Sequence, residues 1–418
     1  MAATLLSHVV SDLCIGRPRV LTLPPSTPIT AALAALRAGA DPFVFVDDAE
    51  PAASSYRAKR GPATVYAKVT VADILCYLCG DAGNLKDPSA ALRRPVSDVA
   101  AAVGPHGVTH RVDPQTRCLS FLNLWLLDAI DVLLTDDGCQ GLLVPLHARA
   151  RKRTSSDCCV LTRDDIVRHL FGSISHFSPI AALTVASLGL VRGDDVHAVR
   201  AHDYGLADVI PLLRRAVSDA TAVAVVSDEA ELVGEICPGV LASCDDVESV
   251  LAAFAALSAG NIMTFIDCSV MSHTPPDFLV RAIRARLKDS GLDAIAELMD
   301  TVEDASVSVT MSSSTSSSNS EDEDSPSRRG GRRRRPRRMS SGSFGCRSTE
   351  DVVACHPGSS LVAVMAQALA HRVGYVWVVD ETSGALVGVV RFADVLAVLR
   401  EHLRPQSQVL CRKSVICV

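Results

Sequence analysis

Residues 371–399 read HRVGYVWVVDETSGALVGVVRFADVLAVL, and this stretch decides the fold. A β-branched and aromatic run over residues 375–379 is followed by a turn signal, DETSG. A second apolar run over residues 386–390 leads into a segment whose apolar residues recur at helical spacing. This pattern predicts two strands followed by a helix. Arg391 and Asp394 stand where the second strand meets the helix, so Asp394 either binds a ligand there or caps the helix.

The same stretch belongs to a longer unit with the order β-α-β-β-α. Upstream of it, an extended segment over residues 352–355 precedes a helix with apolar residues on one face. The same order recurs three more times along the chain. Each unit has about sixty residues, which is too few to bury its apolar sheet face alone, so the units should pack in pairs. The predicted units are residues 17–80, 108–175, 196–260 (degenerate) and 349–403.

The segments between the units have their own composition. Residues 176–195 are predicted to form a linker helix, and residues 261–302 a helical connection. Residues 303–348 are Ser-rich, then acidic, then Arg-rich, so this insertion within the second pair is predicted to be disordered. Residues 404–418 form a C-terminal tail.

Composition places the chain among globular proteins with an aliphatic interior. It has 418 residues, of which 48% are hydrophobic and 4% aromatic, enough for two or three domains with buried cores. A net charge of −6 favours neither a nucleic-acid partner nor an anionic membrane. The 14 cysteines are scattered, as in a reduced cytoplasmic or nuclear protein. Cys76 and Cys79 form a C-x-x-C on one helix face without a second pair, which favours packing over metal or redox chemistry.

No membrane partner is expected. The N-terminus lacks the basic region of a secretory signal, and the longest uncharged apolar segment, residues 177–191, is shorter than the roughly twenty residues of a spanning helix. We therefore expect a cytoplasmic location, a nuclear location, or both.

The repeated unit resembles the cystathionine-β-synthase (CBS) domain. The second strand ends in an aliphatic run and Asp, as in VWVVD, and the third strand closes on G-h-h-x-x-x-D, as in LVGVVRFAD. The resemblance covers residues 17–260 and 349–403 and is most specific in the last unit. Four repeats without a catalytic domain are similar to the γ regulatory subunit of AMP-activated protein kinase and, above all, to plant CBS-only proteins. The implied fold is α/β (α+β), with four CBS units packed as two Bateman modules.

The resemblance also implies a function. CBS pairs bind adenosine-containing ligands or metal ions in their clefts and regulate a partner protein, without catalysis. AMP, ADP, ATP and S-adenosylmethionine are therefore candidate regulatory ligands, and no cofactor is required. In agreement, the chain contains no dinucleotide, P-loop, nucleophile-elbow or zinc-protease motif on the expected elements.

Ligand-binding members of the family carry Thr or Ser, two residues, then Asp where the third strand meets the second helix. A helix N-terminus attracts phosphate, a hydroxyl adds a hydrogen bond, and a carboxylate accepts from ribose hydroxyls. Thr70 and Asp73 preserve the pattern in the first unit, and Thr162 and Asp165 preserve it in the second. These four residues are the predicted ligand site. For either copy alone, helix capping is the alternative interpretation.

The third and fourth units depart from the pattern. The third has CPGV at residues 237–240, with neither hydroxyl nor carboxylate, so we expect no ribose there. The fourth keeps Asp394 but has Arg391 in place of the hydroxyl. Arg391 either binds a phosphate or fills the cleft and pairs with a carboxylate, Asp394 included.

Two hypotheses therefore remain for the function. In the first, an adenosine-type ligand binds in the first CBS pair and modulates a partner protein. In the second, the chain is a γ-like scaffold or adaptor of a kinase complex, and its ligand sites are vestigial. The absence of basic residues beside the second strands of the first three units favours the second hypothesis.

The Arg-rich tract at residues 328–338 has two interpretations. It is either a solvated loop next to an acidic block, or a nuclear-localisation signal or nonspecific nucleic-acid patch. Other nucleic-acid binding is not expected. Ser340 and Ser341 follow the arginines as basophilic kinase sites do, and phosphate there would reduce the positive charge.

Overall fold

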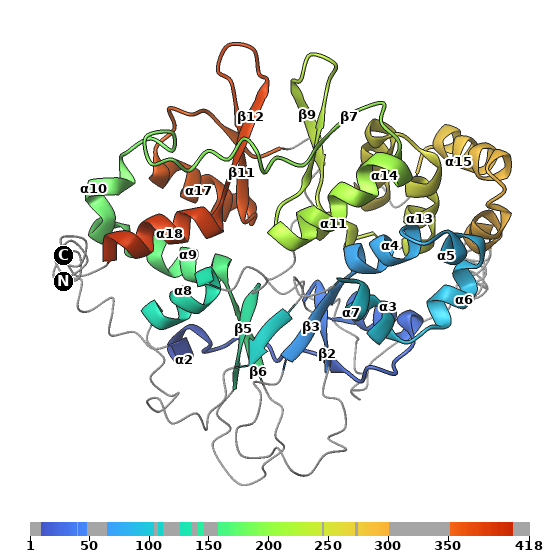
Figure 1. Ribbon diagram of the computed structural model, residues 1–418, viewed down its shortest axis with the longest axis horizontal. Coiled ribbons are helices and arrows are strands. Elements are labelled where there is room, and N and C mark those ends of the chain that lie inside the picture. The colour runs from blue at the N-terminus through green and yellow to red at the C-terminus, as the bar shows by residue number, and fades with distance from the viewer. Residues whose placement is uncertain are drawn as a thin grey trace, which may run out of the picture.

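Strands and helices alternate along this α+β protein, which confirms the predicted fold class. In the computed structural model, the four units surround the middle of the molecule (Figure 1). The insertion at 303–348, with its arginine tract and serines, and the tail at 404–418 lie outside the described residues. The structure describes residues 10–39, 41–47, 65–103, 108–111, 126–135, 140–145, 158–244, 246–271, 275–300 and 352–403.

The first two units share one six-stranded sheet in the order β1-β2-β3-β4-β5-β6. Each unit contributes a parallel pair followed by an antiparallel pair, and the units join edge to edge where β3 runs antiparallel to β4. The strands are β1 (Thr22–Leu23), β2 (Phe43–Asp47), β3 (Val65–Thr70), β4 (Val108–Arg111), β5 (Gly141–Pro145) and β6 (Cys158–Thr162).

Helices cover this sheet, and Ile29, Leu33 and Leu36, which lie on one face of the first long helix, are buried. Between the two units lie three short helices, α5 to α7, which were not predicted from the sequence. The helices of this half are α2 (Val10–Leu13), α3 (Ile29–Ala38), α4 (Val71–Cys79), α5 (Ala82–Lys86), α6 (Pro88–Arg93), α7 (Val96–Val103), α8 (Leu126–Thr135) and α9 (Arg163–Phe171).

The third and fourth units each form a three-stranded sheet with the same pairing pattern. Pro211 lies in the first turn of α11, where a missing N–H costs least. Their elements are β7 (Ala198–Arg200), a π-helical turn η4 (Gly205–Val209), α11 (Ile210–Asp219), β8 (Val223–Val226), β9 (Leu232–Ile236), α12 (Pro238–Leu241), β10 (Ala354–Cys355), α17 (Leu361–His371), β11 (Tyr375–Val379), β12 (Leu386–Arg391) and α18 (Phe392–Leu403).

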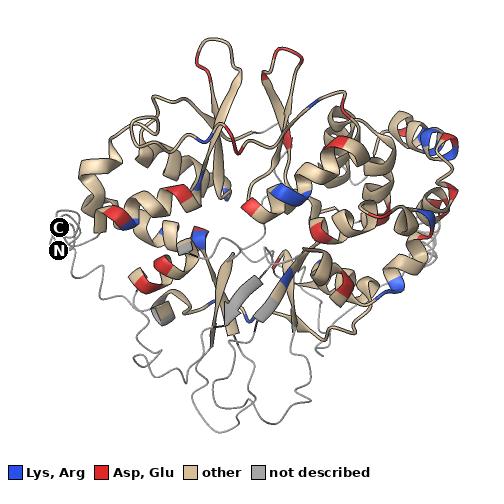
Figure 2. Cartoon of the chain, in the orientation of Figure 1, with Lys and Arg blue, Asp and Glu red and all other residues tan. Residues whose placement is uncertain are grey.

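The hairpins of the third and fourth units project side by side (Figure 1), and acidic residues mark their tips (Figure 2). Leu386 N donates to Ala230 O at 2.9 Å near these tips. Deeper in the interface, Glu235 of β9 is fully buried and accepts from Tyr375 Oη at 3.0 Å and Trp377 Nε1 at 2.6 Å. Because a buried carboxylate needs hydrogen-bond donors, these two bonds fix β11 against β9.

Helix packing joins the two pairs crosswise. The α4 helix of the first unit packs on α11 of the third, and α9 of the second unit packs on α17 and α18 of the fourth. The two large apolar clusters follow this division: one combines the first and third units, and the other combines the second and fourth with Ala222 and Ala224 of the third. Each core is therefore built from both pairs of units.

The predicted linker helix at residues 176–195 is wrong over most of its length. Helical structure is limited to η3 (Ile174–Phe177) and α10 (Ser178–Ala181), and the chain then continues in turns and extended segments. Here the backbone bonds to the fourth unit: Val185 N donates to Ser359 O at 2.9 Å, and Arg192 N donates to Val389 O at 3.0 Å. Donors used in this way cannot bond within a helix, so tertiary pairing overrides the apolar pattern.

The third unit ends with α12 and α13 (Val247–Ala256). The connection that follows it is helical, with α14 (Ala259–Met271), α15 (Asp277–Asp289) and residues 293–300. Buried Leu279, Ile283 and Leu287 anchor α15 through one face. Within the described part of the chain, no helix combines the length and apolarity that crossing a bilayer requires.

Candidate functional site

Thr70 and Asp73 form a capping box at the start of α4. Asp73 Oδ2 accepts from Thr70 N at 2.8 Å and from Thr70 Oγ1 at 2.6 Å, and Asp73 N donates to Thr70 Oγ1 at 3.2 Å. The spacing of three residues therefore has a structural role, because it pairs backbone groups that the helix leaves open. Within the described residues, both hydrogen bonds from Thr70 go to Oδ2 of Asp73. The second carboxylate oxygen of Asp73, Oδ1, can therefore accept from other partners.

Thr162 and Asp165 repeat this box at the start of α9. Asp165 Oδ2 accepts from Thr162 N and from Thr162 Oγ1, both at 2.8 Å. In addition, Arg17 places its two terminal nitrogens on the two carboxylate oxygens, with Nη1 at 2.8 Å from Oδ2. Asp165 is thus fully engaged inside the protein.

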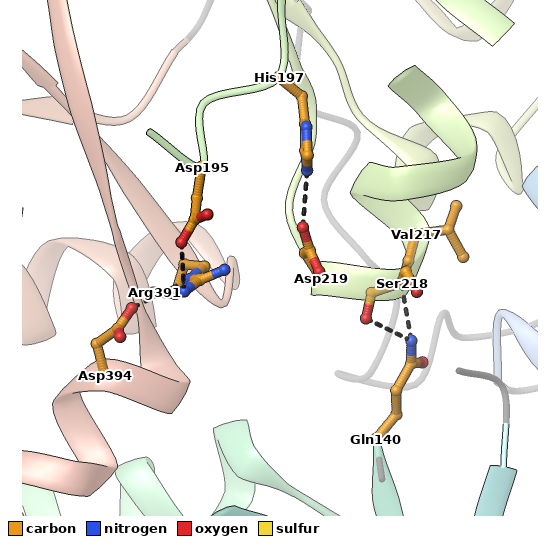
Figure 3. Close-up of polar contacts among 8 residues, drawn as sticks. All are labelled: Gln140, Asp195, His197, Val217, Ser218, Asp219, Arg391 and Asp394. Carbon is orange, nitrogen blue, oxygen red and sulfur yellow. Dashed lines mark hydrogen bonds and ion pairs between the residues drawn. The ribbon is translucent and has the colours of Figure 1, made fainter. Parts of the chain in front are cut away.

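Arg391 pairs with carboxylates, which is one of the two roles expected for it. Its Nε donates to Asp394 Oδ2 at 3.0 Å and its Nη2 to Asp195 Oδ2 at 3.1 Å (Figure 3). Arg192 also donates to Asp394, from Nε to Oδ1 at 3.0 Å. Asp394 therefore lies between two guanidinium groups.

The junction of the third unit carries no side-chain cap. Cys237 precedes the one-turn helix α12, and Pro238 occupies its first position. This agrees with the absence of hydroxyl and carboxylate groups from residues 237–240.

A cavity of about 350 Å³ lies between the first and third units. One wall comes from α4 of the first unit and from α7, which lies between the first two units, and the opposite wall comes from α11 of the third. Tyr77, Ala102 and Val103 provide its apolar part. The lining residues are Lys68, Asp73, Cys76, Tyr77, Ala102, Val103, Gln140, His197, Arg214, Arg215, Val217, Ser218 and Asp219.

The polar lining of this larger cavity combines the cationic side chains of Lys68, Arg214 and Arg215 with two carboxylates, Asp73 and Asp219. Arg214 and Arg215 are both exposed on α11, and Arg214 Nη2 donates to Cys76 O at 3.0 Å. Burial lowers the pKa of Lys68, against the opposing effect of Asp73. Burial raises the pKa of Asp73, although the Thr70 hydrogen bonds and Lys68 act in the other direction.

Hydrogen bonds fix the rim of the larger cavity. Gln140 Nε2 donates to Val217 O at 2.8 Å and to Ser218 O at 3.2 Å (Figure 3). His197 Nε2 lies 2.8 Å from an Asp219 carboxylate oxygen. These contacts tie the C-terminal end of α11 to the second unit and to the segment before β7, so the cavity wall is held from both sides.

A smaller cavity of about 120 Å³ receives residues from all four units. Lys68, Gln140 and Asp219 line both cavities, which makes the two spaces neighbours. Burial raises the pKa of Asp164 to about 6, with a further contribution from Asp165. The lining residues are Lys68, Gln140, Thr162, Arg163, Asp164, Asp219, Ala220, Gly374, Arg391, Phe392 and Ala393.

The structure distributes the predicted site residues instead of gathering them. Asp73 lines the larger cavity, and Thr162 and Arg391 line the smaller one. By contrast, Thr70, Asp165 and Asp394 line neither cavity and are held in the caps and ion pairs described above.

The arginines of the larger cavity were not predicted from the sequence. Arg214 and Arg215 come from α11 of the third unit, the unit with the degenerate junction. The available signal was their place on the polar face of an amphipathic helix, which alone predicts only solvent exposure. Their position opposite Asp73 depends on helix packing between units.

The larger cavity thus offers two carboxylates, Asp73 and Asp219, together with several cations and an apolar wall. Such a set can accept hydrogen bonds from hydroxyl groups, bind a phosphate and cover a flat ring. In the described residues, no cluster of three or more His, Cys, Asp or Glu side chains has the arrangement of a metal site.

Comparisons with known proteins identify chains that are similar to this one. The CBS domain family model matches residues 346–401. The chain is 34% identical over 427 residues to the CBS domain-containing protein CBSX5 of Arabidopsis thaliana, covering 96% of this chain and 99% of that protein. Identity to the CBS domain-containing protein CBSX6 of Arabidopsis thaliana is 22% over 464 residues, covering 96% of this chain and 95% of that protein.

A solved structure shares the fold. It is protein MJ1225 of Methanocaldococcus jannaschii, described as a proposed archaeal homologue of g-AMPK. The TM-score is 0.51 at 14% sequence identity, covering 94% of this chain and all of that one. At this identity the similarity concerns the fold alone.

Proposed function

The chain belongs to the family of CBS-domain proteins, and we propose that it is a regulatory, non-catalytic protein that binds an adenosine nucleotide and modulates a partner protein. The single observation that carries this proposal is the placing of Asp73 opposite Arg214 and Arg215 in one cavity. A nucleotide needs both an acceptor for its ribose hydroxyls and cations for its phosphate. The larger cavity supplies both.

The size of the larger cavity favours a small nucleotide. At about 350 Å³ it is near the lower end of the usual range of about 300–1,000 Å³ for ligand pockets. Tyr77 and Val103 offer an apolar surface for the base, while Arg215 offers a charge at the opposite wall. We therefore expect AMP to bind more tightly than ATP or S-adenosylmethionine, since AMP matches the cavity in size and carries a compact phosphate.

Titration calorimetry of the full chain with AMP, ADP, ATP and S-adenosylmethionine tests the proposal. Asp73→Asn and Arg215→Ala should each weaken AMP binding about tenfold or more, because a hydrogen bond to a charged group is worth about 1.5–3 kcal/mol. Arg37→Ala is the matched control, since it removes an exposed arginine that pairs with Glu248 outside the cavity. Absence of AMP binding at millimolar concentration, or affinity unchanged by both cavity variants, would refute the proposal.

A scaffold function is the second candidate, and one observation favours it. Asp165 and Asp394 are already held by arginines, so their junctions offer a ligand little. A chain of this kind would act through protein contacts, as a γ-like subunit or adaptor of a kinase complex. Affinity purification from native extract tests this candidate: recovery of no kinase subunit or other stable partner would exclude it.

A further inference from the structure

Two leading segments occupy equivalent places in the two CBS pairs. One precedes β1 and the other precedes β7, and each crosses to the second unit of its own pair. Val20 N donates to Cys158 O of β6 at 3.0 Å, and Arg192 N donates to Val389 O of β12 at 3.0 Å. Each leading segment therefore lies along the last strand of the second unit, immediately before that unit's junction.

Each leading segment carries one arginine to the junction carboxylate. Arg17 binds Asp165 through both terminal nitrogens, and Arg192 binds Asp394 through Nε at 3.0 Å and Nη2 at 2.9 Å. The arginine side chains are 30% and 49% exposed, whereas the carboxylates are 11% and 9% exposed. The same arginine–carboxylate contact thus occurs twice, with the two arginines about 175 residues apart in the chain. In both cases the arginine comes from a segment outside the unit that holds the carboxylate.

Asp73 shows what the junction looks like without such a contact. It forms the same capping box as Asp165, yet no described arginine forms a hydrogen bond or salt bridge with it, and it lines the larger cavity. The difference between Asp73 and Asp165 is therefore not the local motif. It is the arginine that arrives from elsewhere in the chain.

From these observations we infer that Arg17 and Arg192 are internal plugs that occupy the ligand-binding carboxylates of the second and fourth units. The native chain then binds one nucleotide, at Asp73, and gains a second site when Arg17 is withdrawn. This inference rests on the proposed function for the Asp73 cavity. Thr162, bonded to Asp165, already lines the smaller cavity, so a ligand at the opened junction would extend from that space.

The exposure of the two arginines makes the plugs removable. The Arg17 and Arg192 side chains are 30% and 49% exposed, so solvent competes with the carboxylate for each guanidinium group. The carboxylate, by contrast, keeps its capping bonds to Thr162 after the arginine leaves. In the fourth unit, Arg391 also binds Asp394, so withdrawal of Arg192 alone leaves that junction closed.

Titration calorimetry with AMP tests the inference on the full chain. We expect one AMP per chain for the wild type, two for Arg17→Met, and one again for Arg17→Met combined with Asp165→Asn. Methionine keeps the apolar stem of the arginine, and Arg17→Gln is the second variant should the first fail to fold. Arg37→Met, in the exposed pair with Glu248, is the matched control and should keep one AMP.

The outcomes separate the plug from the proposed function. If both the wild type and Arg17→Met bind one AMP per chain, the plug is overturned while the proposed function stands. If the wild type already binds two AMP per chain, the plug is also overturned. No AMP for the wild type but one for Arg17→Met supports the plug and refutes the open Asp73 site. No AMP for either protein overturns both.

Discussion

Replacing Asp164 by Asn should stabilise the protein at neutral pH. Asp164 lies in the first turn of α9 and lines the smaller cavity, where a Cβ added at Gly374 would meet its Oδ1 at 3.0 Å. Burial, reinforced by Asp165, raises its pKa to about 6 from the ordinary 3.8, although Lys68 acts in the opposite direction. Above pH 6 the folded protein therefore holds an ionised carboxylate in an unfavourable place.

The magnitude follows from linkage. The rise from 3.8 to about 6 corresponds to about 3 kcal/mol at 1.36 kcal/mol per pKa unit. Asn gives up the favourable interaction of a carboxylate with the helix N-terminus, about 0.3–1 kcal/mol. We therefore expect Asp164→Asn to raise the free energy of unfolding by about 2 kcal/mol at pH 7.5.

The sign of the pH dependence is fixed by the raised pKa. Between about pH 4 and pH 6 the folded state binds more protons than the unfolded state, so the wild type loses stability as the pH rises through this window. Asp164→Asn has no titrating carboxylate at this position, so its stability does not fall in this pH window for this reason. The difference between the two proteins should thus shrink to about 1 kcal/mol at pH 5 and disappear below about pH 4.

Urea unfolding of both proteins at pH 7.5 and pH 5 measures this difference. Asp128→Asn is the matched control, because Asp128 lies in the first turn of α8 but is exposed. Asp128→Asn should lower the free energy of unfolding slightly, because it removes only the favourable interaction of a carboxylate with the helix N-terminus. The reasoning is refuted if Asp164→Asn is no more stable than the wild type at pH 7.5, or if its advantage does not narrow on acidification.

Three further predictions concern packing and thiol chemistry. Tyr375→Phe removes a hydrogen bond to buried Glu235 and should lower the free energy of unfolding by about 1–2 kcal/mol in urea titrations; an unchanged midpoint would contradict this role. Gly205→Ala should prevent native packing, because the Cβ of the new alanine would lie 2.1 Å from Phe254 O. The effect should be measured as a loss of soluble folded protein or a fall in Tm of several degrees. Burial raises the pKa of Cys76 to about 12, so this thiol should resist a thiol-specific disulfide reagent at pH 8 until urea is added, and rapid native labelling would count against its burial.

Local patterns in the sequence were sufficient to predict the strands and helix of residues 371–399 and to form the helix caps. The alternation and helical spacing over residues 371–399 predicted β11, β12 and α18, and the structure shows these three elements. The spacing of Thr70 and Asp73 is enough to form a capping box, because both partners lie within one helical turn. Properties of this kind depend on residues only a few positions apart.

The linker shows where local patterns fail. Residues 176–195 carry the apolar spacing of a helix, but backbone groups of the fourth unit capture their donors and acceptors. Residues close in sequence do not predict these competing hydrogen bonds, since the acceptor Val389 lies almost two hundred positions after Arg192. The prediction was wrong because the competing hydrogen bonds are long-range.

By itself, the sequence determined that this is a chain of four CBS units, with carboxylates at three of the four junctions. Only the tertiary structure decided which carboxylate faces a cavity. Packing of α4 on α11 brings Arg214 and Arg215 opposite Asp73, while the leading segments bring Arg17 to Asp165 and Arg192 to Asp394. The physical reason is that a carboxylate's role depends on the charges and space around it, and these come from segments brought together only when the four units pack.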